Sequence, residues 1–163
     1  MHEKCPPVRN DEDEGTPRRP TRAQALRRLA AIYGQADSAY ARFSCPSSAE
    51  CCQLQRRGRQ PWLWPLEWAA VEDALKRQGR EVPPPRADGG CALLDEGGRR
   101  CTVYADRPFG CRTYFCERAS GGRHPLEATT EIAARLEALA MEADPDAAGG
   151  GPRPILDWLG GAR

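Results

Sequence analysis

The sequence predicts a small α+β fold that is mainly helical, with one short β-hairpin and an irregular, cysteine-rich core. Three observations lead to this class. Apolar residues recur at helical spacing in three separate stretches. Two short apolar runs flank a turn that contains glycines at positions 97 and 98. Eight cysteines occur in 163 residues, and most of them fall in two dense groups. The length allows one domain with a tail at either end.

Residues 1–20 are polar, charged and interrupted by prolines. Such a segment buries too little apolar surface to offset the entropy lost on ordering, so we expect a disordered tail. It has no apolar run, which is unlike a signal peptide, and no stretch of the chain approaches the roughly 18 apolar residues that span a membrane. We therefore expect a cytoplasmic protein, in which a cysteine cluster more often binds metal or carries out redox chemistry than forms disulfides.

Two helices are predicted in the first half of the chain. The first covers residues 22–41, and Thr21 is a suitable cap for its N-terminus. The second begins at Pro65, which suits a first helical turn, and ends at Gly79. Glu67 lies in its first turn, where a carboxylate interacts favourably with the helix dipole.

The stretch at residues 91–108, CALLDEGGRRCTVYADRP, is typical of a β-hairpin. Its two strands would bring Cys91 and Cys101 close together. The third predicted helix follows at residues 124–144, and its inward-facing apolar residues are expected to be Leu126, Ile132, Leu136 and Leu139.

The expected domain covers residues 21–143 and contains both cysteine groups. Residues 144–163 form a Gly/Pro linker and a short apolar segment, which we expect to dock back on the domain.

The cysteine spacing predicts a metal site. The first group is Cys45, Cys51 and Cys52, and the second is Cys91, Cys101, Cys111 and Cys116. Cysteines a few residues apart can direct their sulfurs at one ion about 2.3 Å away. A site built from both groups would staple the core together and couple metal binding to folding. All-sulfur sites select zinc or iron–sulfur clusters. His124 is expected to be a helix-entry residue rather than a ligand.

Arginines accompany the second cysteine group. Arg107 and Arg112 lie within it, and we expect their guanidinium groups to hydrogen-bond sulfur and to lower thiol pKa values. Tyr114 lies between the last two cysteines of the group, and we place it with these arginines around the ligands.

The stretch CALLDEGGRRCTVYADRPFGCRTYFC, residues 91–116, follows the pattern C-P-x-L … C-x-I-Y-x-x-R-P-x-x-C-R-x-Y-x-C. It thereby resembles the YkgJ-type cysteine-cluster family, which carries a CxxCxxCC motif and is described as a zinc- or iron-chelating domain. The resemblance covers about residues 43–118. CPSSAECC matches the CxxCxxCC motif except at Ser48, which replaces the second cysteine. Seven cysteines therefore match the pattern, which fits one four-sulfur site with spare thiols or a binuclear site that shares sulfurs.

The resemblance leaves the metal open. A related cysteine motif in the flagellin lysine methylase is linked to an iron–sulfur cluster, which implies that a cluster is possible here. It does not imply methylase activity, because the sequence has no glycine-rich strand-to-helix turn for a methyl donor. Adjacent Cys51 and Cys52 are awkwardly placed to bind one small zinc ion, so we favour an iron–sulfur cluster over zinc.

Several function classes stay open. The favoured one is a metal-binding protein that holds an iron–sulfur cluster or zinc. The alternatives are a zinc-stapled protein-interaction module, which would have a protein partner, and a thiol redox enzyme or accessory of a modifying enzyme. An enzyme is less favoured, because there is no C-x-x-C beside a βαβ pattern and no Ser-His-Asp set that we can place.

Nucleic-acid binding is a further alternative. QRRGRQPWLW, residues 55–64, combines arginines with Trp62 and Trp64, on which bases could stack. We instead expect both tryptophans to pack over the metal site, with solvated arginines beside them. The formal net charge of +1 gives no signature of polyanion binding either. We expect neither a membrane nor a nucleic acid as a partner.

Overall fold

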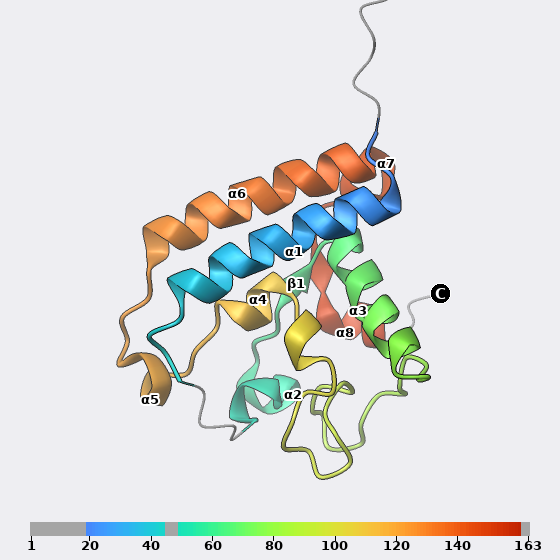
Figure 1. Ribbon diagram of the computed structural model, residues 1–163. Coiled ribbons are helices and arrows are strands. Elements are labelled where there is room, and N and C mark those ends of the chain that lie inside the picture. The colour runs from blue at the N-terminus through green and yellow to red at the C-terminus, as the bar shows by residue number, and fades with distance from the viewer. Residues whose placement is uncertain (1–18, 45–48, 161–163) are drawn as a thin grey trace, which may run out of the picture.

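The computed structural model describes residues 19–44 and 49–160, and helices dominate it (Figure 1). The helices α1 (Arg22–Ala39) and α6 (Leu126–Ala143) run side by side in opposite directions (Figure 1). Beneath α1 lie α3 (Pro65–Arg77) and the single turn α4 (Phe109–Arg112). Most of the predicted tail at residues 1–20, together with Cys45, lies outside the described residues.

The remaining elements are short. Two 3-10 turns cover Glu50–Cys52 and Tyr104–Asp106. The short helices are α2 (Leu54–Arg57), α5 (Glu117–Ser120), α7 (Pro145–Ala148) and α8 (Ile155–Leu159). None of the helices formed by the described residues is long and apolar enough to cross a bilayer.

The layer of α1 and α6 forms one of the two hydrophobic clusters. A capping box starts α1, because the Thr21 hydroxyl accepts from the Gln24 N–H at 3.3 Å and the Gln24 side chain accepts from the Thr21 N–H at 2.8 Å. The predicted start of this helix is therefore confirmed. The cluster between the two helices contains Leu29, Ile32, Tyr33, Ala36, Ile132, Leu136 and Leu139.

Leu126 does not join this cluster, so its predicted inward position is wrong: the side chain is 72% exposed. Leu126 is the first residue of α6, six positions before the buried Ile132. At 100° per residue that separation turns it about 120° away from the buried face.

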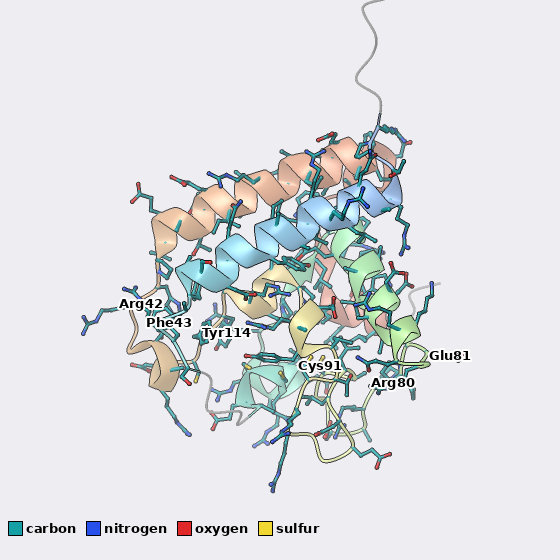
Figure 2. All side chains as sticks on the ribbon, in the orientation of Figure 1. Arg42, Phe43, Arg80, Glu81, Cys91 and Tyr114 are labelled. Carbon is teal, nitrogen blue, oxygen red and sulfur yellow. The ribbon has the colours of Figure 1, made fainter. Side chains whose placement is uncertain are left out.

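The helix α3 starts at Pro65, as predicted, and ends at Arg77, two residues before Gly79. Its buried face, Trp68, Val71, Ala74 and Leu75, belongs to the second hydrophobic cluster. Beyond its C-terminal end Glu81 points into solvent, whereas Cys91 lies in the interior (Figure 2).

The predicted hairpin at residues 91–108 is reduced to a single bridge pair, Leu94 with Cys101. The chain turns early, because the Leu94 N–H donates to the Cys91 carbonyl at 3.1 Å. The Asp95 carboxylate accepts from the N–H groups of Arg99 and Arg100 at 2.8 and 3.3 Å and closes a compact loop. The Asp95 N–H donates to the Arg100 carbonyl and the Thr102 N–H to the Leu93 carbonyl, each at 2.8 Å, so the two arms pair only beside this turn and the prediction of two strands there is wrong.

The antiparallel sheet that does form joins β1 (Trp62–Leu63) to β2 (Arg153–Pro154). Leu63 is fully buried and Trp62 is 58% exposed, because successive residues of a strand point to opposite faces. The expectation that both tryptophans pack inward is therefore wrong for Trp62. Trp64 is half-buried against the cluster of α1 and α6.

The C-terminal apolar segment packs on the rest of the structure. Ile155 and Leu159 are buried in the second hydrophobic cluster, and Trp158 stacks on Trp68 with ring centroids 5.6 Å apart. The Ile155 N–H donates to the Pro61 carbonyl at 2.9 Å, which continues the contact between β1 and β2.

Candidate metal centre

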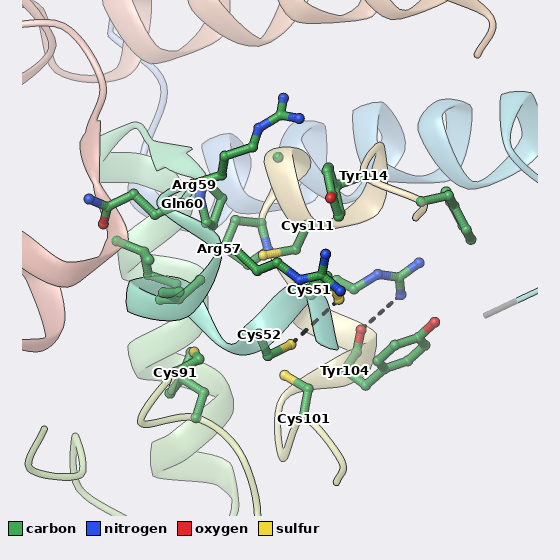
Figure 3. Close-up of a pocket in the computed structure, with 18 residues that line it drawn as sticks. Cys51, Cys52, Arg57, Arg59, Gln60, Cys91, Cys101, Tyr104, Cys111 and Tyr114 are labelled. Carbon is green, nitrogen blue, oxygen red and sulfur yellow. Dashed lines mark hydrogen bonds between the residues drawn. The ribbon is translucent and has the colours of Figure 1, made fainter. Parts of the chain in front are cut away.

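Five cysteines from both sequence groups line one pocket of about 300 Å³ (Figure 3). They come from separate parts of the chain: a 3-10 turn, the loop that follows α3, and α4. The sequence reasoning expected such a convergence. The five residues, here called the pocket cysteines, are Cys51, Cys52, Cys91, Cys101 and Cys111.

The other predicted ligands lie elsewhere. Cys116 precedes α5 as its N-terminal cap and does not line the pocket. Cys45 is outside the described residues. His124 lies among aromatic rings, with its centroid 6.3 Å from that of Tyr40 and 6.1 Å from that of Phe43. Ligand roles for Cys45 and Cys116 stay predictions.

Backbone hydrogen bonds join the two cysteine groups. The Cys91 N–H donates to the Cys52 carbonyl at 2.7 Å, and the Gln55 N–H donates to the Gly89 carbonyl at 3.2 Å. Gly89 has a φ of 70°, and a Cβ there would lie 2.5 Å from the Gln55 Oε1 atom. Glycine is therefore needed for this close approach, which brings Cys91 beside Cys52.

Glu67 fixes the start of α4 and hence the position of Cys111. Its carboxylate is fully buried and accepts from the Phe109 N–H at 2.7 Å, the Tyr33 hydroxyl at 3.0 Å and the Trp64 N–H at 3.0 Å. One side chain thus ties α1, α3 and α4 together. Sequence reasoning placed Glu67 in a first helical turn but did not anticipate this role.

The hydrogen bonds of Arg112 go to oxygen rather than to sulfur. Its guanidinium donates to the carbonyls of Arg107, at 2.8 Å, and Ala105, and to the Asp37 carboxylate at 2.5 Å. It also lies over the Tyr33 ring, 4.1 Å from the centroid. Its side chain is only 4% exposed. Arg112 therefore holds the loop that precedes α4.

Arg107 and Tyr114 line the pocket, as do Arg57 and Arg59, which belong to the arginine-rich stretch at residues 55–64 and were expected only to be solvated. The positive charge of Arg107 favours the thiolate of Cys101, and that of Arg57 favours the thiolate of Cys51. Arg57 could have been recognised from its position, since it follows Cys52 by five residues, at the end of α2.

Burial sets the protonation of most pocket thiols. It raises the pKa of Cys91 to about 11, and it raises the pKa values of Cys101 and Cys111 as well. Cys51 differs, because its Sγ lies 3.8 Å from that of Cys52 and a hydrogen bond from the Cys52 thiol stabilises the Cys51 thiolate. This contact lowers the pKa of Cys51 to about 7.

In metal-free, reduced protein at pH 7, iodoacetamide is expected to alkylate Cys51 at least about tenfold faster than Cys91, because the thiolate is the reacting species. Peptide mass spectrometry after short exposures measures both rates. Raising the pH through 7 should increase the Cys51 rate to a plateau, while the Cys91 rate keeps rising towards pH 11. Equal rates at pH 7 would contradict the assignment.

The donor set fits the soft metals, since the pocket offers thiols and no histidine. In the described ranges, no three Cys, His, Asp or Glu side chains lie close enough together to hold one ion as they stand. A tetrahedral zinc site with bonds of about 2.3 Å needs sulfurs about 3.8 Å apart. In a cluster each iron atom takes only one or two of the protein's thiolates, so no three of these sulfurs need to gather around one atom.

Comparison with known families supports this reading of the pocket. The profile of the CxxCxxCC family, described as "Putative zinc- or iron-chelating domain", matches residues 44–134, more than half of the chain. Searches of curated proteins and of solved structures found no match. The matched range contains all five pocket cysteines. The resemblance drawn from residues 91–116 is confirmed, and the chain belongs to the CxxCxxCC family of zinc- or iron-chelating domains.

Proposed function

We propose that this protein holds an iron–sulfur cluster in the cytoplasm, with thiolates of the pocket cysteines as ligands. The observation that carries the proposal is the convergence of five cysteines, from both sequence groups, on one pocket. Four thiolates complete a cluster, so the pocket has one thiol more than it needs. A bound cluster supplies one-electron chemistry.

The charges around the pocket suit an anionic centre. Four thiolates on a zinc ion or on a typical cluster leave a net negative charge. Four nearby arginines share only two carboxylates, so positive charge is in excess there. The pairs are Glu50 with Arg57 and Arg118, and Asp37 with Arg107 and Arg112.

The sulfur positions favour a cluster over a single ion. Cys51 and Cys52, with Sγ atoms 3.8 Å apart, lie at the separation that tetrahedral zinc requires. That contact makes zinc the second candidate, because closing a zinc site would need two more sulfurs to move towards this pair. A cluster does not require three protein sulfurs around one atom, and no group of three such ligands is found among the described residues.

The packing favours metal chelation over the role of a metal-stapled interaction module. Among the described residues, the hydrophobic cluster between α1 and α6 contains no cysteine, whereas the cluster around α3 and α8 includes Cys91, with Cys52 and Cys101 packed against it. The two long helices α1 and α6 therefore pack together without the pocket cysteines. Loss of metal is therefore expected to loosen the loops around the pocket more than the long helices.

Anaerobic purification followed by metal and sulfide analysis tests the proposal. We expect a brown protein with a broad absorption band near ~400 nm, bound iron and acid-labile sulfide. A colourless protein with stoichiometric zinc would replace the cluster by the second candidate. A protein that binds neither metal after reconstitution would contradict both.

A further inference from the structure

The pocket has walls that the metal centre does not need. Away from the sulfurs its lining is apolar and comes from Leu54, Pro61, Leu93, Pro108, Phe115 and Ile155. A volume of about 300 Å³ is at the lower end of the range for small-molecule sites. A metal centre beside the sulfurs takes up part of this volume, so a second occupant has to be small and to lie along the apolar wall.

Three polar side chains of the pocket lie on the same side of it. In Figure 3, Arg59, Gln60 and Tyr114 lie on the side opposite Cys91 and Cys101. The Arg59 guanidinium lies 5.6 Å from the centroid of the Tyr114 ring. Among the described residues it forms no ion pair with a carboxylate, unlike Arg57 and Arg107. A guanidinium without a carboxylate partner beside an aromatic ring suits a planar anion. The anion can form a charge-assisted pair with the guanidinium and stack on the ring.

The excess of positive charge determines the sign of the ligand. Arg57 and Arg107 line the pocket in the pairs described above, in which each carboxylate also binds a second arginine. Those arginines offset the negative charge of the metal centre. Arg59 adds one further positive charge on the side of the pocket opposite Cys91 and Cys101, where Figure 3 also shows Cys111, and this charge favours an anion over a neutral ligand.

We infer that this pocket binds a small organic anion, a carboxylate on a flat apolar body, beside the metal centre. The carboxylate pairs with Arg59, and the apolar body contacts Tyr114 and the wall that includes Leu93 and Ile155. This inference deepens the proposed function, on which it rests for the position of the metal, by naming a ligand class for the same pocket.

Titration with 1-naphthoate tests the inference, with the neutral 1-naphthamide as the matched probe of the same shape. Isothermal titration calorimetry on metal-loaded protein is expected to give at least about tenfold tighter binding of 1-naphthoate, because only the carboxylate forms a charge-assisted pair. Arg59→Gln is expected to remove most of that difference. Arg135→Gln, on α6 and hydrogen-bonded to Gln35, is the control and should leave both affinities unchanged.

Two results would overturn the inference: equal affinity for the two probes, or an Arg59→Gln variant that keeps the preference for 1-naphthoate. Metal content is measured on every sample, so the proposed function is judged separately. Should the protein bind no metal, titration of the metal-free protein with both probes still decides whether the pocket selects an anion. An Arg59→Gln variant that loses metal and keeps the preference would assign Arg59 to the metal centre alone, against the inference.

Discussion

Replacing Cys111 with serine is expected to lower the metal content of the purified protein at least about tenfold. Cys111 lies on α4, whose start is held by Glu67 and whose Gly110 packs so closely that a Cβ there would lie 2.9 Å from the Pro61 Cβ atom. Because this backbone is fixed on two sides, another thiol of the pocket cannot easily take the position of the lost sulfur. A serine hydroxyl is a poor replacement for a thiolate with zinc or iron.

The matched control is Cys116→Ser, which removes a thiol of the same sequence group outside the pocket. Metal analysis and circular dichroism on both variants separate loss of a ligand from loss of the fold. Because the proposed ligands are the pocket cysteines, we expect Cys116→Ser to keep its metal, and loss of metal there would instead bear out the ligand role that the sequence predicts for Cys116. Equal metal in wild type and Cys111→Ser would show that Cys111 is not a ligand, and loss only in Cys116→Ser would place the ligands outside the pocket.

Glu67→Ala is expected to destabilise the protein by about 3–5 kcal/mol, since several buried donors lose their acceptor at once. These donors are the N–H groups of Phe109 and Trp64 and the hydroxyl of Tyr33. Each unsatisfied donor costs about 1–3 kcal/mol, and the substitution also leaves a cavity. Urea denaturation followed by circular dichroism measures the change in the free energy of unfolding.

Glu81→Ala provides the comparison, because Glu81 is exposed and lies just past the end of α3. It should change the free energy of unfolding by less than about 0.5 kcal/mol. Glu67→Gln keeps one acceptor oxygen and should fall between the two. If Glu67→Ala were no more harmful than Glu81→Ala, the carboxylate would not hold α4 in the way the hydrogen bonds indicate.

The long helices could be predicted from the sequence because their signals are local. Thr21 and Gln24 form a capping box within four residues, and Pro65 fixes the first turn of α3. The sheet could not be predicted in this way. Residues 62–63 pair with residues 153–154, about ninety positions away, and nothing near either pair indicates its partner. The hairpin expected at residues 91–108 is limited to one bridge pair, because the chain turns at Cys91–Leu94 before it and forms a 3-10 turn at Tyr104–Asp106 after it.

The cysteines of the candidate site could be predicted from the sequence, whereas the residues that hold the surrounding backbone in place could not. Cysteine spacing and the match to a family pattern indicated the metal-binding character, and the structure gathers five of the seven predicted ligands. The supporting residues depend on tertiary contacts. In the sequence, Glu67 has the features of an ordinary residue in a first helical turn. Its side chain is buried because α1 and α4 pack against it in the folded protein. Arg112 likewise donates a hydrogen bond to the carboxylate of Asp37, which lies 75 positions earlier in the chain.

Ile155 lies in the pocket wall, yet it comes from α8, beyond the residues 44–134 that the family profile matches. All five pocket cysteines lie within that range. The shared domain thus supplies the sulfurs, while a peripheral segment shapes part of the space in front of them. If the pocket binds an organic anion as inferred, a change in the C-terminal segment would alter which ligand fits beside the metal centre. The thiolates that hold the metal would stay the same.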